Sequence, residues 1–302
     1  MYNTNAGVMV FFSLCALSAQ AKTPSFPVEQ MLVFSVRSTQ GTGIYRASLA
    51  KPIPERLTPE GMRANWPVPS PDGKTIAFQR WQNDQIDIWT MTVDGREHTE
   101  LIAEPDHDYL PTWMSDGKSL VYLRWQIYQG ETERRSRYWQ YDFASRQSHL
   151  LGTFNQSTSA PVVESPQGDA LIFTHQHQDG SRALYRWLLT DTQPAIWLRE
   201  NRQISTPVFS IDGKTLYFAA SEIEGDSKIY ARDLDSGNER MLYGQTPAWY
   251  PSLCGEWLVA TTQRGAEESS GYRITMIHLA SGHTEFADFG QHSLVEARCL
   301  PK

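Results

Sequence analysis

Basic side chains are scarce in this sequence, and so are long apolar runs. Across 302 residues, 27 Lys and Arg stand against 34 Asp and Glu, which leaves a net charge of −7. A protein that binds nucleic acid needs a basic surface, so nucleic acid is excluded as the main partner. The one marked apolar run, Val8–Leu17, is too short to cross a bilayer comfortably, so the chain is predicted not to span a membrane.

Motifs for the best-known catalytic chemistries are absent as well. The chain has no Gly-x-Ser-x-Gly nucleophile elbow, no His-Glu-x-x-His pair and no glycine loop that would cradle a phosphate. The glycines of Gly41-Thr42-Gly43 are predicted to form a hairpin turn instead. These absences argue against the familiar enzyme types, while a lyase without a recognisable motif stays open.

The first 21 residues are predicted to be a signal peptide rather than part of the fold. Val8–Leu17 supplies the apolar segment, and Ala19-Gln20-Ala21 supplies the small residues of a cleavage site before Lys22. Met1–Asn5 carry no basic side chain, which departs from the usual pattern, and a buried N-terminal strand is the alternative. An exported chain is expected in the periplasm, with an extracellular location as the alternative.

What the sequence does contain is one motif in five copies. Ser70-Pro71-Asp72-Gly73-Lys74, followed by an apolar segment, returns with variation, and the copies are centred on Gly73, Gly117, Gly168, Gly213 and Gly255. The Asp-Gly pair supplies the positive φ that a tight hairpin needs. A spacing of about 40–50 residues between copies, in segments that read as strands, is typical of a β-propeller.

Each repeat reads as four strands, of which the innermost contains a proline. Five full repeats begin near residues 66, 110, 160, 206 and 246. An upstream partial repeat, Met31–Thr58, lacks its first strand, and Leu294–Pro301 is a lone strand without a blade. If the C-terminal strand completes blade one, exposed sheet edges are removed. The sequence therefore predicts an all-β domain over 22–302, a six-bladed β-propeller of four-stranded blades closed by its C-terminal strand.

The same register places Cys254 and Cys299 near the ends of innermost strands in neighbouring blades. They are the only cysteines that remain after the predicted cleavage. An even pair in an oxidising compartment favours a disulfide between them. Two unpaired buried thiols are the alternative.

The motif from Pro67 to Lys74 resembles the repeat of TolB-like propellers, the Tol-type (PD40/WD40-like) class. The resemblance covers about residues 29–301 and implies the fold more firmly than the function. TolB carries an α/β domain before its propeller, whereas only Lys22–Gln30 separate the predicted cleavage site from blade one, so this chain is expected to lack that domain. The resemblance also implies a partner protein at one channel mouth and no cofactor other than a channel cation such as calcium.

The residues that enter the innermost strands are expected to line that mouth, by their position alone. They are Asn65, Trp66, His107, Asp108, Tyr109, Ser159, Ser205, Gln245 and Glu296. This ring is polar with aromatic side chains, which suits a bound partner segment. A solvated mouth without a ligand is the alternative.

Two histidine-containing segments could carry other chemistry. Glu104–Tyr109 combines carboxylates with His107, but alternate residues of an extended loop point to opposite sides. His175 and His177 could begin a metal site, yet they are predicted in the loop between the second and third strands, away from the inner-strand entry. Neither segment is therefore assigned a catalytic role.

The longest insertion, Arg124–Arg137, falls in blade three and places Trp125 and Tyr128 before a tip of mixed charge. Exposed aromatics beside arginines are common in protein interfaces. The insertion suits either a partner contact or a plain solvated loop.

Together these features predict an exported, monomeric and non-catalytic propeller that binds a periplasmic or envelope protein. The first alternative is a polysaccharide lyase or another glycan-active propeller that uses channel histidine and arginine with a divalent cation. The second alternative is a sensor of glycans or small ligands without turnover.

Overall fold

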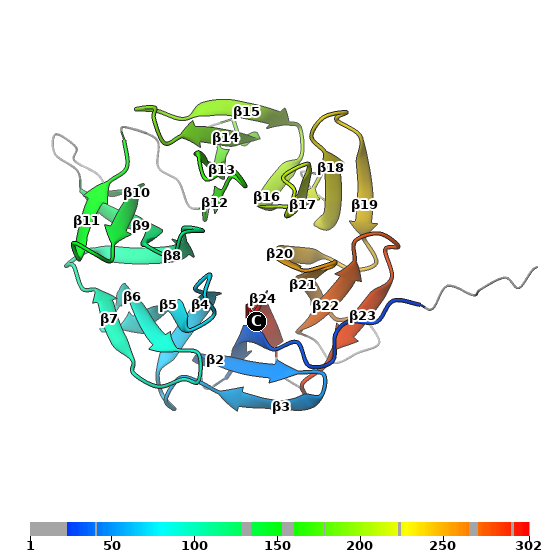
Figure 1. The fold of residues 1–302 in the computed structure, drawn as a ribbon, viewed down its shortest axis with the longest axis horizontal. Helices are drawn as coiled ribbons and strands as arrows, with labels where there is room; N and C mark the ends of the chain where they lie inside the picture. Colours follow the sequence, from blue (N-terminus) through cyan, green and yellow to red (C-terminus); the bar gives the residue numbers. More distant parts are fainter. Residues whose placement is uncertain are drawn as a thin grey trace, which may run out of the picture.

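The computed structural model describes residues 23–39, 41–127, 134–152, 160–177, 179–222, 225–265, 271–290 and 293–301. In this part of the chain 24 β-strands form six four-stranded antiparallel sheets around a common centre, as Figure 1 shows. The predicted six-bladed propeller is therefore confirmed. The segment predicted as a signal peptide, residues 1–21, lies outside the described residues. Among the described residues, no helix has the length and apolarity to cross a bilayer.

The first three blades contain the following strands. Blade one comprises β1 (Leu32–Ser38), β2 (Gly41–Ser48), β3 (Lys51–Arg56) and β24 (Ser293–Cys299). Blade two comprises β4 (Arg63–Pro69), β5 (Thr75–Gln82), β6 (Gln85–Thr92) and β7 (Thr99–Ile102). Blade three comprises β8 (His107–Trp113), β9 (Ser119–Ile127), β10 (Arg134–Asp142) and β11 (Gln147–Leu150).

The remaining three blades contain the following strands, given from the centre outward. Blade four comprises β12 (Val163–Glu164), β13 (Ala170–Gln176), β14 (Arg182–Leu188) and β15 (Ala195–Glu200). Blade five comprises β16 (Gln203–Phe209), β17 (Thr215–Ser221), β18 (Lys228–Asp233) and β19 (Glu239–Tyr243). Blade six comprises β20 (Ala248–Cys254), β21 (Trp257–Gln263), β22 (Tyr272–His278) and β23 (Thr284–Ala287).

The repeated motif forms the hairpin between the first and second strands of a blade. Gly73 adopts a φ of 68° in this turn. The Ser70 hydroxyl donates to the Asp72 carboxylate at 2.7 Å, and the same carboxylate accepts from the Lys74 backbone N–H at 3.1 Å. Ser210 and Asp212 repeat the arrangement in blade five. The serine and aspartate of the motif thus stabilise the turn by hydrogen bonds, while the glycine supplies its backbone conformation.

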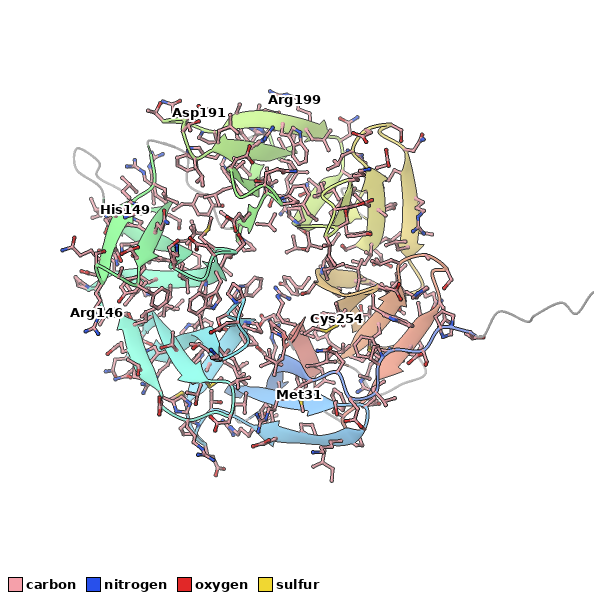
Figure 2. All side chains as sticks on the ribbon, viewed as in Figure 1. Met31, Arg146, His149, Asp191, Arg199 and Cys254 are labelled. Carbon is pink, nitrogen blue, oxygen red and sulfur yellow. A yellow bond between two sulfur atoms is a disulfide. The ribbon has the colours of Figure 1, made fainter. Side chains whose placement is uncertain are left out.

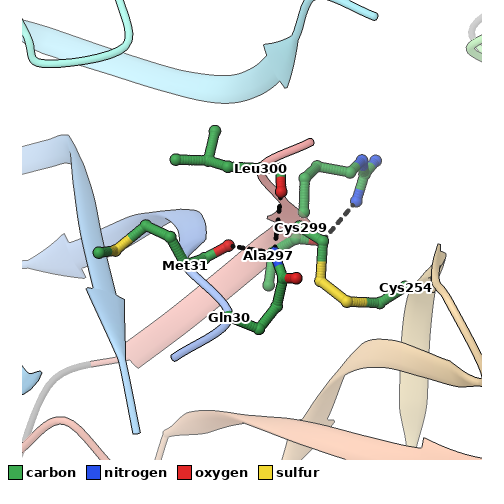
Figure 3. Close-up of a disulfide and its surroundings, with 7 residues drawn as sticks. Gln30, Met31, Cys254, Ala297, Cys299 and Leu300 are labelled. Carbon is green, nitrogen blue, oxygen red and sulfur yellow. Dashed lines mark hydrogen bonds between the residues drawn. A yellow bond between two sulfur atoms is a disulfide. The ribbon is translucent and has the colours of Figure 1, made fainter. Parts of the chain in front are cut away.

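The ring is closed by pairing between the two ends of the chain. Strand β24 pairs antiparallel with β1, which confirms that the C-terminal strand completes blade one. A disulfide joins Cys254 of β20 to Cys299 of β24, with 5.7 Å between the Cα atoms, as Figure 3 shows. Beside it, the Gln30 side-chain amide donates to the carbonyl of Leu300 at 2.8 Å. Blade six and blade one are therefore linked covalently as well as by packing.

Large side chains fill the space between neighbouring blades. Between blades six and one, Phe34 stacks on Phe289 with 5.3 Å between ring centroids. Phe26, which precedes the first strand and is 1% exposed, packs edge-on against Trp257 at 5.7 Å. In Figure 2, charged side chains such as Arg146 lie on the outer rim. The core is thus a set of inter-blade layers rather than one central cluster, which leaves the middle of the disc available for a cavity.

Candidate functional site

The innermost strands bulge where they border the centre of the disc. Five bulge residues adopt a left-handed backbone, namely Trp66 (φ 57°), Leu110 (54°), Thr206 (45°), Tyr250 (54°) and Glu296 (59°). For bulky or β-branched side chains this conformation costs about 1–3 kcal/mol each. A bulge also turns its side chain away from the strand's regular alternation. The strained residues can therefore face the centre instead of the neighbouring blade.

A central cavity of about 380 Å³ lies among the inner strands of blades two to six. Its described lining residues are Trp66, Leu110, Ala160, Pro161, Thr174, His175, Gln176, Arg182, Ser205, Thr206, Trp249 and Tyr250. The Trp66 and Tyr250 rings meet edge-on, with 5.3 Å between centroids. The volume is that of a site for a small ligand or a few side chains of a protein.

One side of the central cavity is cationic. Arg182 is its only arginine or lysine among the described residues, and no described Asp or Glu lines it. Burial lowers the pKa of the Arg182 guanidinium, and its Nη2 donates weakly to the Gln176 side-chain carbonyl at 3.5 Å. Burial and the neighbouring His177 also lower the pKa of His175, which favours its neutral form. The cavity therefore presents a guanidinium beside neutral polar groups and aromatic rings.

The position of His175 corrects the sequence interpretation, which placed it away from the inner-strand entry. His175 belongs to β13 and lines the central cavity. The described part of the inner strand β12 pairs only with Leu171 and Ile172, whereas β8 of blade three pairs along most of its partner β9. The part of β13 beyond these two pairs, which includes His175, lines the cavity.

Four of the other predicted mouth residues have different positions around the cavity. Ser205, on the inner strand of blade five, lines it. Asn65 hydrogen-bonds to Gln79 at 2.9 Å and more weakly to Glu296 at 3.5 Å, which places it next to the wall. Glu296 itself is 2% exposed and serves as a buried acceptor behind Trp66. Gln245 is exposed in the loop before β20, and the predicted residue Ser159 lies outside the described residues.

His107 and Tyr109 belong to a second, smaller pocket rather than to the central cavity. This pocket measures about 280 Å³, and its described lining residues are Ile86, His107, Tyr109, Trp125 and Ser136. The His107 and Trp125 rings lie 5.1 Å apart, and the Tyr109 hydroxyl hydrogen-bonds to Ser136. Two predicted mouth residues thus combine with the base of the long β9–β10 hairpin. The tip of that insertion, including Tyr128, lies outside the described residues.

Asp108, which lies between them in the chain, points inward. It is fully buried and pairs with the Arg124 guanidinium through contacts of 2.7 and 3.0 Å. Burial raises the pKa of Asp108 to about 7, against the opposing effect of Arg124. Alternation along β8 separates the three neighbours, so Asp108 supports the blade while His107 and Tyr109 border the second pocket.

A calcium ion in the channel would need six to eight oxygen ligands, supplied by carboxylates, carbonyl groups and waters. Among the described residues no group of three or more His, Cys, Asp or Glu converges in a way that could hold a metal. The rings of His175 and His177 lie 5.4 Å apart, but two imidazoles do not complete such a site. No described cluster of such side chains accounts for the channel cation that the family resemblance implies, and the cation stays a prediction.

A simple sequence signal could have located the central cavity more closely. In every full repeat the residue before the inner-strand proline lines it, and these residues are Trp66, Leu110, Ala160, Thr206 and Tyr250. The prediction used residues that enter the strand one to three positions earlier in most blades. The proline marks the bulge, because it cannot donate a ladder hydrogen bond.

Comparison with known proteins supports the fold. No protein-family model and no curated protein sequence match this chain. TolB from Acinetobacter baumannii is similar in structure, with a TM-score of 0.76, 17% identity and coverage of 91% of this chain and 67% of that one. A chain in a nidogen/laminin complex has a TM-score of 0.68, 13% identity and coverage of 90% and 98%. An oligogalacturonate lyase in complex with manganese has a TM-score of 0.55, 14% identity and coverage of 85% and 72%.

The expected likeness to TolB-type propellers is thus confirmed at the level of the fold. At these identities the likeness shows architecture alone, because propellers of one architecture carry unrelated activities. The neighbours illustrate this, since they include a protein complex and a lyase.

Proposed function

We propose that this protein is an exported, monomeric and non-catalytic propeller that binds another protein of the periplasm or cell envelope at the central cavity. One observation carries the proposal: Trp66, Leu110, Thr206 and Tyr250, strained bulge residues from four blades, converge on one cavity. Backbone strain persists only where the surrounding structure maintains it, and it concentrates at functional sites.

The chemistry of the cavity suits a protein partner. Trp66, Trp249 and Tyr250 give it aromatic walls, and Ser205 and Gln176 add polar groups at its edge. Aromatic side chains in a concave, rigid site contribute most of the binding energy in many interfaces. The strands hold these side chains in place before binding, which limits the entropic cost of association.

Two comparisons add support. TolB, with the higher TM-score, has this fold, and a propeller of nearly the same extent occurs in a complex of nidogen with laminin. Export is supported by the predicted signal peptide and by the disulfide between Cys254 and Cys299, because disulfides persist in oxidising compartments.

Site-specific photo-crosslinking in intact cells tests the proposal. A photoreactive phenylalanine analogue replaces Ser205, which lines the cavity, and as a matched control it replaces Ile53, which is 85% exposed on the outer strand β3. We expect a discrete crosslinked protein from position 205 in the envelope fraction and none from position 53. Trp249→Ala in the position-205 background should weaken the adduct, because it removes one aromatic wall.

Two results would contradict the proposal. One is the same adduct from both positions, which would indicate an outer-surface contact. The other is no adduct from position 205 although the labelled protein is folded and present in the periplasmic fraction. In that case the glycan-active enzyme and the ligand sensor become the leading candidates. Depolymerisation of acidic oligosaccharides by the purified protein, with and without added divalent metal, would separate those two.

A further inference from the structure

The central cavity contains polar atoms that the folded protein leaves without hydrogen bonds. The Arg182 Nε and the Thr206 hydroxyl oxygen are both buried and have no partner among the described residues. Both residues line the same cavity, although they come from β14 and β16 of different blades. Buried polar groups are almost always satisfied by protein atoms or ordered water, so two such groups at one cavity are available to water or to a ligand.

The charge at the cavity points to an anion. The guanidinium of Arg182 has no ion pair with any described carboxylate, in contrast to Arg186 on the same strand, which contacts Asp169 at 3.2 Å. A partly desolvated cation without a counter-charge is unfavourable, and an anion that enters the cavity would remove that cost. The planar guanidinium matches a carboxylate through two parallel hydrogen bonds.

The remaining lining limits the kind of anion. One guanidinium balances a single negative charge, whereas a phosphate dianion would bring a second charge into a protein whose net charge is already −7. The rings of Trp66, Trp249 and Tyr250 form an apolar wall in the same cavity. A volume of about 380 Å³ suits a ligand the size of an amino-acid derivative or a dipeptide, or the end of a larger ligand.

We propose that the central cavity binds a monocarboxylate attached to an apolar or aromatic group, with the carboxylate on Arg182 and the apolar part against Trp66 and Tyr250. The Thr206 hydroxyl provides a further donor for the bound group. The carboxylate comes either from a free small acid or from an acidic side chain of a docked protein. The proposal concerns the same chemistry in both cases and does not depend on a protein partner being found.

Binding of matched acid and amide probes to the mature protein tests this proposal. The first pair is 3-phenylpropionate and its uncharged amide, and the second pair is acetyl-Phe-Glu-amide and acetyl-Phe-Gln-amide. Calorimetry measures binding directly. Tryptophan fluorescence also reports on it, because Trp66 and Trp249 line the cavity. We expect the acid of at least one pair to bind about 10- to 100-fold more tightly than its amide, the range for a charge-assisted hydrogen bond in a partly buried site.

Two variants with the same change in net charge assign the effect to one side chain. Arg182→Gln should abolish the preference for the acid, whereas Arg186→Gln, on the same strand but outside the cavity lining, should retain it. Circular dichroism and thermal unfolding verify that both variants are folded.

Equal binding of acid and amide in both pairs would overturn the proposal, and so would an acid preference that survives Arg182→Gln. A preference confined to the peptide pair assigns the anion to a docked protein, and one that includes 3-phenylpropionate assigns it to a free small acid. Loss of the crosslink from position 205 together with retained acid binding would contradict the protein-docking function alone.

Discussion

The Glu296 carboxylate accepts a hydrogen bond of 2.8 Å from the backbone N–H of Trp66. Glu296 lies on the closing strand of blade one, and Trp66 lies on the inner strand of blade two at the wall of the central cavity. The same carboxylate accepts from the Ser35 hydroxyl at 2.7 Å. One buried side chain thus connects ring closure with the strained bulge that shapes the cavity.

Glu296→Ala should therefore destabilise the protein and also disturb the cavity. The substitution leaves the Trp66 N–H and the Ser35 hydroxyl without their acceptor, at a cost of about 1–3 kcal/mol in the free energy of unfolding. Urea unfolding measures this loss. Glu60→Ala, in an exposed turn, is the control and should change stability by much less. Equal losses in the two variants would show that the buried carboxylate has no special role in closure.

Reduction of the Cys254–Cys299 disulfide should loosen the closure without removing the fold. The bond closes a loop of 45 residues, which corresponds to about 4 kcal/mol in the loop-entropy description. We expect Cys254→Ser/Cys299→Ser to have a lower urea midpoint than the oxidised protein and to be insensitive to dithiothreitol. A parent protein whose midpoint is unchanged by complete reduction would contradict this expectation.

The turn glycine of blade two should be less replaceable than that of blade six. Both have positive φ, 68° at Gly73 and 63° at Gly255, so alanine at either position costs about 1–2 kcal/mol in backbone strain. A Cβ at Gly73 would also lie 2.9 Å from the Pro301 carbonyl oxygen, whereas at Gly255 it would meet nothing within 4 Å. We therefore expect Gly73→Ala to lower the melting temperature more than Gly255→Ala. Equal losses would show that the chain end after β24 shifts to accommodate the Cβ, and a reversed order would also contradict the prediction.

The Asp108–Arg124 pair should give the protein a specific pH dependence of stability. Burial raises the pKa of Asp108 from 3.8 to about 7, so the folded state favours the protonated carboxyl. The resulting contribution to stability is fully present below about pH 4 and is lost as pH rises through 7. Relative to Asp108→Asn, the parent should thus be more stable at pH 4.5 than at pH 8.

Urea unfolding of both proteins at pH 4.5, 6 and 8 measures this difference. Asp116→Asn, which removes one carboxylate in an exposed turn, is the control for the change in net charge. A parent that gains stability relative to Asp108→Asn as the pH rises would mean that Arg124 keeps Asp108 ionised in the folded state.

The sequence by itself determined the architecture, because its signals are local. Asp72 and Gly73 form a hairpin through their own hydrogen bonds and φ preference, and five copies of that turn at a regular spacing mark five of the six blades. The partial repeat Met31–Thr58 lacks its first strand, and Leu294–Pro301 is a strand without a repeat of its own. Pairing between the two completes a blade, so the closure was predictable, and β24 does pair with β1.

The tertiary structure alone decided which side chains share a cavity. Trp66 and Tyr250 meet because bulges in different blades turn them toward one centre, and no spacing along the chain encodes that convergence. His175, on the second strand of blade four, lines the cavity, and Asp108 turns inward to pair with Arg124. Contacts between blades depend on how six sheets are placed around one axis, and that placement results from packing across the whole ring rather than from any local segment.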